Sequence, residues 1–313
     1  MTDKTIVVTS ATVDSDYSFP LPLTCLLWRE LIGFEPVVYL VGEPSMWYSG
    51  APNVCYEALN KHRFECRFVP RIDAYSDGTV AKHVREHAAI DVSIPADTWI
   101  MPADADLWPL KREFYHQHEG AKEKAVLYYS NGDNFRSKEE TLAMFFSGHR
   151  FPTIALCHAT MRAAEWRDTF DLLPATSLVD NLLLTFIQAR VNEARYVPDG
   201  ETKAAWEWWV NSDQRVLTWC LALQPWFHNK GQGADVRYIE RSKRRGPPDD
   251  RLDRAFPADW MTFAMQMATD AHIFKNPEHP QHWKALSKLF KLKLPHHAEW
   301  AEAYHKDYVS AGQ

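Results

Sequence analysis

The sequence predicts an α/β fold in which a mostly parallel central sheet is flanked by helices. In the first 110 residues, short apolar runs rich in β-branched residues alternate with segments of helical character. The fourth of these runs ends in two carboxylates one residue apart, Asp104 and Asp106. Hydrophobic residues make up 46% of the chain, which is enough for a substantial core.

Four apolar runs are expected to form strands: 5–9, 36–41, 66–69 and 98–101. Pro20 and Pro22 are expected to open a helix that runs to residue 31, and Gly33 is expected to close it. Asn53 is expected to cap a helix that runs to residue 62, and a third helix is expected over 79–90. Pro102 is expected to end the fourth strand, since it has no backbone N–H to donate.

The second half of the chain is less regular. Residues 124–130 and 152–158 are expected as strands, and 177–191 as a helix. The polar stretch 242–254 is expected as a surface loop. From residue 282 onward, lysines among apolar residues predict a basic amphipathic helix. Such a helix can make weak peripheral contact with an anionic membrane, or pack its apolar face on the domain.

Composition excludes some function classes. The net charge of −6 argues against a nucleic-acid binder. The five cysteines follow no disulfide or metal-binding spacing and are expected as reduced core residues. The start of the chain lacks a signal-peptide pattern, and no apolar run is long enough to span a membrane. A cytoplasmic location is therefore expected. Neither a G-x-G-x-x-G nor a P-loop motif is present.

The carboxylates of Asp104 and Asp106 carry the main functional signal. They follow a buried strand, and the carboxyl edge of an open α/β sheet is where ligands bind. Carboxylates at this spacing suit one hard divalent cation, Mg²⁺ or Mn²⁺, held together with a diphosphate. The alternative is a solvated turn, in which Asp is common.

Four strand–helix units that end in Asp-x-Asp resemble a GT-A glycosyltransferase. Three later segments resemble the glycogenin-like retaining transferases: residues 154–161 with 165–167, residues 212–217, and residues 270–275. The second of these resembles the DQDxLN motif, with Arg215 in place of the second aspartate and Thr218 in place of the asparagine. The glycine that usually follows the late histidine is absent.

The resemblance implies a fold, a metal site and a set of ligand contacts. It implies a Rossmann-like GT-A sheet with a smaller, mixed C-terminal acceptor half. The implied ligands of Mn²⁺ or Mg²⁺ are Asp104, Asp106 and His272. The implied contacts to the donor nucleotide are Thr9, Ser10, Ala11, Asp14, Tyr17, Lys82, Arg85, Asp104, Ala105 and Asp106. The implied catalytic residues are Asp213, Gln214 and Asp180.

Several of these residues also have purely structural explanations. Asp213 can cap the helix that begins beside it, or act either as an inverting base or as part of the donor face in a retaining enzyme. Asp180 can hold sugar hydroxyls or face outward. Lys82 and Arg85 can reach phosphate or form a solvated helix face, and His272 can be an ordinary, partly buried histidine.

The predicted organisation is one catalytic domain, 1–281, followed by a basic helical extension, 282–313. The domain comprises a nucleotide-binding half, 1–110, and an acceptor half, 111–281. The predicted activity is metal-dependent transfer of a sugar from a nucleoside-diphosphate donor, a UDP-sugar by expectation, to a glycan or other hydroxyl acceptor. The alternatives are a phosphatase of the haloacid dehalogenase type and a non-catalytic protein that binds nucleotide sugars.

Overall fold

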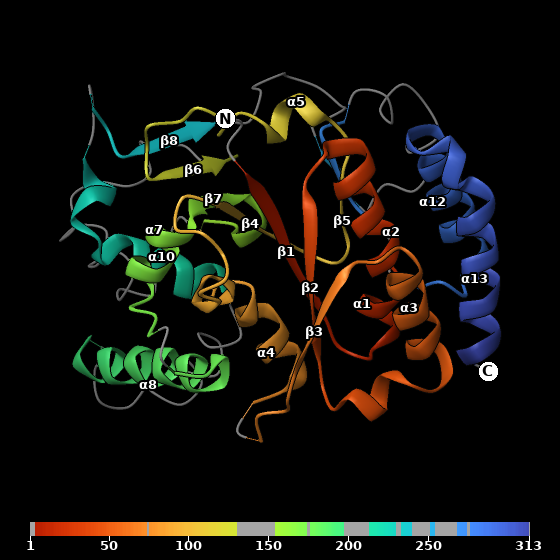
Figure 1. The fold of residues 1–313 in the computed structure, drawn as a ribbon, viewed down its shortest axis with the longest axis horizontal. Helices are drawn as coiled ribbons and strands as arrows, with labels where there is room; N and C mark the ends of the chain where they lie inside the picture. Colours follow the sequence, from red (N-terminus) through yellow and green to blue (C-terminus); the bar gives the residue numbers. More distant parts are fainter. Residues whose placement is uncertain are drawn as a thin grey trace. The chain divides into compact units, whose positions relative to one another are not determined.

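The computed structural model describes residues 4–73, 75–129, 154–173, 176–196, 213–229, 233–239, 251–253, 268–273 and 276–312 of the 313-residue chain. The chain divides into two compact units whose segments alternate along the sequence. Unit 1 comprises Met1–Thr5, Ile72–Pro102 and His118–Arg241, and unit 2 comprises Ile6–Arg71, Ala103–Gln117 and Ser242–Gln313. Both units combine strands and helices (Figure 1).

Unit 2 is built on three parallel strands in the order β3-β2-β1. These are β1 (Thr5–Ala11), β2 (Glu35–Val41) and β3 (Glu65–Val69). Every residue of β1 is buried, as expected for a parallel strand that is covered on both faces. The three strands expected in this part of the sequence are therefore confirmed, with ends shifted by one or two residues.

Helices connect these strands. The first expected helix is confirmed as α2 (Leu21–Leu26), which continues as a π-helical turn, η1 (Leu27–Ile32). Gly33 closes this turn with a φ of +91°. The expected cap at Asn53 is wrong: the N-cap residue of α3 (Gly50–Lys61) is Ser49, four residues earlier. Pro52 lies in the first turn, where its missing N–H removes no helical hydrogen bond. The shorter elements of this region are α1 (Ser15–Ser18), η2 (Pro44–Trp47) and α5 (Arg112–Tyr115).

A second, three-stranded sheet in unit 2 has the order β5-β10-β9. Its strands are β5 (Leu107–Pro109), β9 (Arg251–Asp253) and β10 (Asp270–His272). The expectation of a loop over 242–254 is wrong for residues 251–253, because their backbone pairs in parallel with β10. The rest of that stretch lies outside the described residues.

Two helices, rather than one, end the chain: α12 (Pro280–Lys293) and α13 (Ala298–Gly312), joined by the 3₁₀ turn η8 (Pro295–His297). The apolar side chains of α12, among them Trp283, Leu286 and Phe290, are buried in the core of unit 2. The expected membrane contact is therefore unsupported, because this face packs on the protein. No helix within the described part of the chain is long and apolar enough to cross a membrane.

Unit 1 contains a mixed sheet of four strands in the order β4-β7-β6-β8. They are β4 (Trp99–Ala103), β6 (Ala125–Tyr128), β7 (Ala159–Arg162) and β8 (Val236–Ile239). β7 runs antiparallel to β4 and β6, whereas β6 and β8 are parallel.

Two expectations about the strands of unit 1 are wrong. β4 continues through Pro102, since its pairing with β7 involves only Trp99 and Ile100. The strand expected at 152–158 begins later, because residues 156–158 form a 3₁₀ turn closed by the His158 N–H and the Ala155 carbonyl (3.0 Å).

The helices and 3₁₀ turns of unit 1 are α4 (Asp77–Val84), η3 (Ala88–Ile90), η5 (Leu156–His158), α7 (Ala163–Thr169), α8 (Leu178–Tyr196), α10 (Asp213–Leu223) and η6 (Pro225–His228). The helix expected over 79–90 is interrupted after Val84 and resumes as η3. The helix expected over 177–191 is confirmed as α8. The α/β class, with mostly parallel strands in unit 2 and mixed strands in unit 1, is confirmed.

Candidate active site

The Asp-x-Asp segment forms an anchored turn in unit 2. The Leu107 N–H donates to the Asp104 carbonyl (3.2 Å), so the chain reverses over residues 104–107 and enters β5. The Thr24 hydroxyl, from α2, donates to the Ala105 carbonyl at 2.6 Å. Both Thr24 and Ala105 are buried. The two carboxylates are thus held on a turn that is tied to a core helix.

Strand pairing brings the late histidine to this turn. β10 runs antiparallel to β5 and places His272 opposite Leu107, the residue directly after the acidic pair. The next residue, Ile273, donates its N–H to the Asp106 carbonyl at 2.9 Å. Nε2 of His272 consequently lies 3.4 Å from Oδ2 of Asp106. The structure therefore joins two segments more than 160 residues apart in the sequence.

Asp104, Asp106 and His272 form a group that could hold a metal ion. One ligand atom from each residue lies within 4.8 Å of those of the other two. The Asp106 side chain is 4% exposed and that of His272 is 21% exposed, so the group is partly screened from water but accessible. Two carboxylates and one neutral imidazole suit a divalent cation, and the imidazole favours Mn²⁺ over Mg²⁺. The residues present fit the predicted metal.

The loop expected to hold the nucleoside follows β1 in the same unit. The side chains of Thr9, Ser10 and Ala11 are buried, whereas Asp14 is exposed and Tyr17 is half-buried. The Asp14 carboxylate accepts the Asp16 N–H (2.9 Å) at the start of α1. Asp14 and Tyr17 are therefore the members of this predicted set whose side chains a ligand can reach.

A second group of predicted residues lies in unit 1. Nη2 of Arg85 lies 2.6 Å from Oδ2 of Asp213. The Arg85 side chain is 5% exposed and that of Asp213 is 13% exposed. Oδ1 of Asp213 accepts the N–H of Gln214 (2.8 Å) at the start of α10. Arg85 also donates from Nε to the Lys82 carbonyl (3.2 Å). Asp213 thus combines an ion pair with a hydrogen bond from the backbone of the next residue, at the first position of α10.

The last catalytic candidate, Asp180, is exposed near the start of α8. The Ser177 hydroxyl donates to its carboxylate (2.6 Å), and the Asp180 N–H donates back to that hydroxyl (3.1 Å). This is a reciprocal helix cap, which agrees with the outward-facing alternative. Trp208 and Trp209, whose aromatic rings could stack on a sugar, lie outside the described residues.

Sequence reasoning missed a buried acid beside the second group. Glu86 is fully buried, and its carboxylate lies 2.8 Å from Nδ1 of His83. Burial raises the pKa of Glu86 to about 7, against the lowering effect of His83, while the nearby Asp213 raises it further. The sequence feature that could have pointed to Glu86 is the concentration of titratable residues over positions 83–87.

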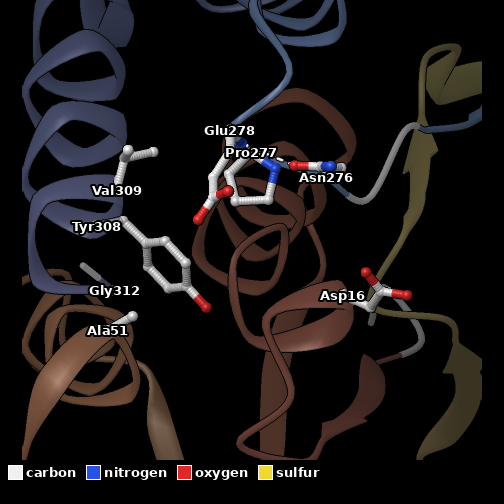
Figure 2. Close-up of a pocket in the computed structure, with 8 residues that line it drawn as sticks. All are labelled: Asp16, Ala51, Asn276, Pro277, Glu278, Tyr308, Val309 and Gly312. Atoms are coloured by element: carbon white, nitrogen blue, oxygen red, sulfur yellow. Dashed lines mark hydrogen bonds between the residues drawn. The ribbon is translucent and has the colours of Figure 1, made fainter.

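A pocket of about 280 Å³ lies beside α1 in unit 2 (Figure 2). Its polar side chains include Asp16, Asn276 and Glu278, and its wall includes Tyr308 from α13. None of the predicted site residues lines it. Two carboxylates on its lining disfavour an anionic diphosphate, so this pocket is a poor place for the donor.

No family model matches the sequence, and no curated protein matches it. The fold is similar to those of several solved glycosyltransferases. A structure of the galactosyltransferase LgtC in complex with donor and acceptor sugar analogs is 10% identical, with a TM-score of 0.46, over 92% of this chain and 94% of that one. Mouse xyloside xylosyltransferase 1 in its apo form is 11% identical, with a TM-score of 0.38, over 86% and 97%. The apo structure of the bifunctional glycosyltransferase WbbM is 9% identical, with a TM-score of 0.47, over 97% and 52%.

Proposed function

We propose that this protein is a metal-dependent glycosyltransferase that moves a sugar from a nucleoside-diphosphate donor, a UDP-sugar, to a hydroxyl group of a saccharide or other acceptor. The observation that carries the proposal is the group formed by Asp104, Asp106 and His272. Their ligand atoms come together on an anchored turn although one of the three is remote in sequence.

The chemistry of glycosyl transfer explains why such a group is needed. A diphosphate leaves the anomeric carbon with growing negative charge while the sugar becomes oxocarbenium-like. A divalent cation, when bound, offsets that charge without any proton transfer. Asp104 and Asp106 supply the negative charge that holds the cation, and the neutral imidazole of His272 completes the set from the neighbouring strand.

The remaining roles belong to the same proposal. Asp14 and Tyr17 would contact the base or ribose, and Thr9, Ser10 and Ala11 would shape that loop. Lys82 and Arg85 would face phosphate. Asp213 and Gln214, with Asp180 on α8, would serve the sugar and acceptor. The functions would divide between a nucleotide-binding half, 1–110, and an acceptor half, 111–281, with 282–313 as a helical extension.

The Arg85–Asp213 ion pair adds a constraint on these roles. Oδ2 of Asp213 is engaged by Arg85 and Oδ1 by a backbone N–H. A carboxylate oxygen can accept more than one hydrogen bond, so Asp213 would take the proton of an acceptor hydroxyl beside these two existing contacts.

The haloacid dehalogenase alternative is not favoured. In that class the Asp-x-Asp motif normally follows the first strand and continues to threonine. Here it follows β4 and continues to Leu107 and Trp108. A non-catalytic protein that binds nucleotide sugars shares the same metal group, so turnover distinguishes it from an enzyme.

A donor screen tests the proposal. The protein is incubated with a panel of UDP-sugars and Mn²⁺ or Mg²⁺, and release of UDP is measured with and without chelator. We expect slow, metal-dependent hydrolysis of one or a few donors. Asp104→Asn and Asp106→Asn should each lower turnover by about 100-fold or more, because each removes one ligand charge while keeping the side-chain shape.

The matched control is Asp307→Asn, which neutralises an exposed aspartate on α13 in the same unit. It should leave turnover and metal dependence unchanged. Metal-dependent binding of UDP-sugars without any hydrolysis would favour the binding protein. Cleavage of simple phosphate monoesters would favour the phosphatase, and full activity of Asp106→Asn in chelator would rule out the metal group.

A further inference from the structure

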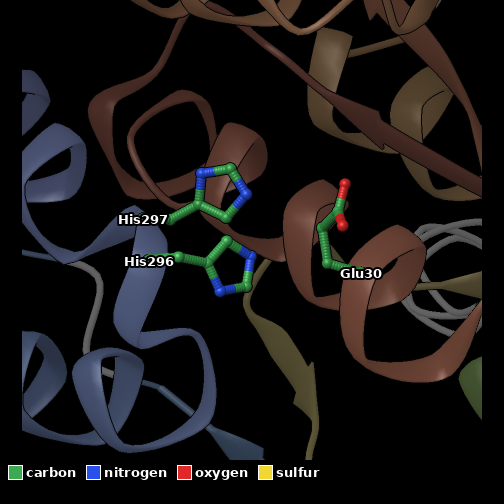
Figure 3. A group of neighbouring side chains, drawn as sticks. All are labelled: Glu30, His296 and His297. Carbon is green, nitrogen blue, oxygen red and sulfur yellow. The ribbon is translucent and has the colours of Figure 1, made fainter.

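A second group of potential metal ligands lies in unit 2, at a separate place from Asp104 and Asp106. It comprises Glu30, His296 and His297, and one ligand atom of each lies within 4.8 Å of the others. Figure 3 shows the two imidazole rings side by side on one segment and the Glu30 side chain facing them from another. Glu30 and His296 are exposed, and His297 is half-buried.

Two unusual turns of the backbone place these side chains. Glu30 belongs to η1, the π-helical turn between α2 and Gly33. Single π-helical turns inside helices are frequent at functional sites. The histidines belong to η8, a 3₁₀ turn between α12 and α13 that begins at Pro295. The His297 N–H donates to the Leu294 carbonyl (3.1 Å) and closes this turn.

Neighbouring rings orient the less exposed histidine. The His297 ring lies 5.6 Å from that of His62, at the end of α3, and 6.4 Å from that of Trp300. His62 in turn packs edge-on against Trp300 at 4.5 Å. Arg29 donates to the His62 carbonyl (2.5 Å) and so ties η1 to the end of α3. Ligands oriented in advance by their surroundings are typical of metal sites.

We propose that Glu30, His296 and His297 form a binding site for a transition-metal cation, of which Zn²⁺ is the best match. Two imidazoles and one carboxylate are a known donor set for zinc, with water in the remaining position. Mg²⁺ and Ca²⁺ prefer oxygen ligands, so this site differs in selectivity from Asp104 and Asp106. The proposal does not rest on the proposed glycosyltransferase activity.

The geometry requires only a small adjustment. Zinc–ligand bonds of about 2.0–2.2 Å place tetrahedral ligand atoms about 3.3–3.5 Å apart. The present atoms lie within 4.8 Å, and two of the three side chains are exposed and can change rotamer. A bound ion would link the first helical segment of unit 2 to the junction of its last two helices. Because it binds the folded protein, it would also raise the melting temperature.

The test is a titration of the full chain with zinc chloride in the presence of excess Mg²⁺, followed by calorimetry and by thermal unfolding. Wild-type protein should bind zinc and melt at a higher temperature with it. Glu30→Gln, His296→Gln and His297→Gln should each weaken this binding at least tenfold, or remove one equivalent of bound zinc, and abolish most of the rise in melting temperature.

His279→Gln is the matched control, since His279 is an exposed histidine just before α12 in the same unit. It should bind zinc as the wild type does. Glu30, His296 and His279 are exposed, so without metal their variants should melt close to the wild type. His297 is half-buried, so the effect of zinc on His297→Gln is measured against that variant's own melting temperature without metal. Equal zinc binding by Glu30→Gln, His297→Gln and the wild type would overturn the proposal, as would an equal loss in His279→Gln.

Discussion

Glu86 illustrates how burial gives a single residue a property that its sequence position does not display. Its carboxylate is removed from water and lies against His83, and burial raises its pKa to about 7. Close by, His87 is also fully buried, with its ring nitrogens 2.9 Å from the His83 carbonyl and 2.8 Å from the Thr185 hydroxyl. Burial lowers the pKa of His87 to about 3, so this ring is neutral at physiological pH.

Replacing Glu86 by Gln should change how stability depends on pH. The pKa of Glu86 in the folded protein lies above its ordinary value of 4.5. Its contribution to stability is therefore fully present below about pH 4.5 and is lost as the pH rises through about 7. Glutamine cannot ionise, so Glu86→Gln should gain stability relative to the wild type over this window, about 3 kcal/mol by pH 8.

Urea unfolding of both proteins at several values between pH 4.5 and 8 measures this difference. His87 acts in the opposite direction. The unfolded chain takes up a proton below about pH 6.5, whereas the folded ring stays neutral to about pH 3, so stability falls as the pH falls through this range. His87 is present in both proteins, so its effect cancels in the difference between them. Parallel stability curves for Glu86→Gln and the wild type would show that Glu86 stays ionised in the fold.

The candidate site was predictable residue by residue only in part. Asp104 and Asp106 stand out because they follow an apolar strand, and the structure brings His272 to them as the resemblance implied. The Arg85–Asp213 pair was not predicted as a pair, since its members are 128 residues apart and no local pattern links them. Glu86 was missed because a helix sequence does not reveal which acid faces the core.

At the level of elements, the first helical segment of unit 2 shows how a sequence signal can be correct while the geometry differs. Pro20, Pro22 and Gly33 correctly marked its ends, yet its second half is π-helical. The N–H of Gly33 donates to the carbonyls of Trp28 and Arg29 (3.0 and 3.1 Å). This closure requires the left-handed backbone that only glycine adopts without cost.

Gly33→Ala should lower the free energy of unfolding by about 1–2 kcal/mol, because alanine is strained at a φ of +91°. Crowding is not the cause, since an added Cβ would lie 3.6 Å from the nearest atom, Nη2 of Arg112. Gly78→Ala, at an ordinary φ in the first turn of α4, is the control and should stabilise by about 0.5–1 kcal/mol. Chemical denaturation compares them, and equal effects of the two substitutions would contradict the role assigned to Gly33.

The elements predicted wrongly have different physical reasons. Asn53 and Pro102 have strong local preferences, but Asn53 lies inside α3 and Pro102 inside β4. The pairing of β4 with β7 involves only Trp99 and Ile100, so it needs no N–H from Pro102. The preference of Asn for a cap is worth only about 1 kcal/mol and did not decide where α3 begins. The strand expected at 152–158 begins at Ala159 instead, because a 3₁₀ turn occupies residues 156–158.

At the scale of the whole molecule, the order of strands and helices was predictable but the interleaving of the two units was not. Alternating periodicity reveals the strands and helices of the first 110 residues. It contains nothing about the pairing of β5 with β10, which brings residues 107–109 beside residues 270–272. That pairing brings His272 to Asp104 and Asp106, so the candidate metal site depends on a long-range contact that periodicity cannot predict.

The C-terminal helices are part of the same long-range construction. α13 packs on α3, and its side chains Ala301, Tyr304 and Tyr308 are buried in the core of unit 2 (Figure 1). The Tyr304 hydroxyl donates to the Phe19 carbonyl (2.8 Å), and the Tyr308 hydroxyl lies 2.7 Å from the Ser18 hydroxyl. The last helix therefore packs against the end of α1 and the residue that follows it.

Deleting residues 295–313 should abolish cooperative folding of unit 2. The deletion exposes Phe19 and one face of α3 to water. It also removes Glu302, which accepts a hydrogen bond from the indole N–H of Trp283 on α12 (2.8 Å). Loss of the near-ultraviolet dichroism of the aromatic core and of a sharp thermal transition would report this. Tyr308→Phe is the matched control: it keeps the buried ring, removes only the hydroxyl, and should cost about 1 kcal/mol with a cooperative transition retained. A truncated chain that melts as sharply as the wild type would mean that α13 is dispensable for the core, and that the C-terminal segment is an appendage rather than a layer of the fold.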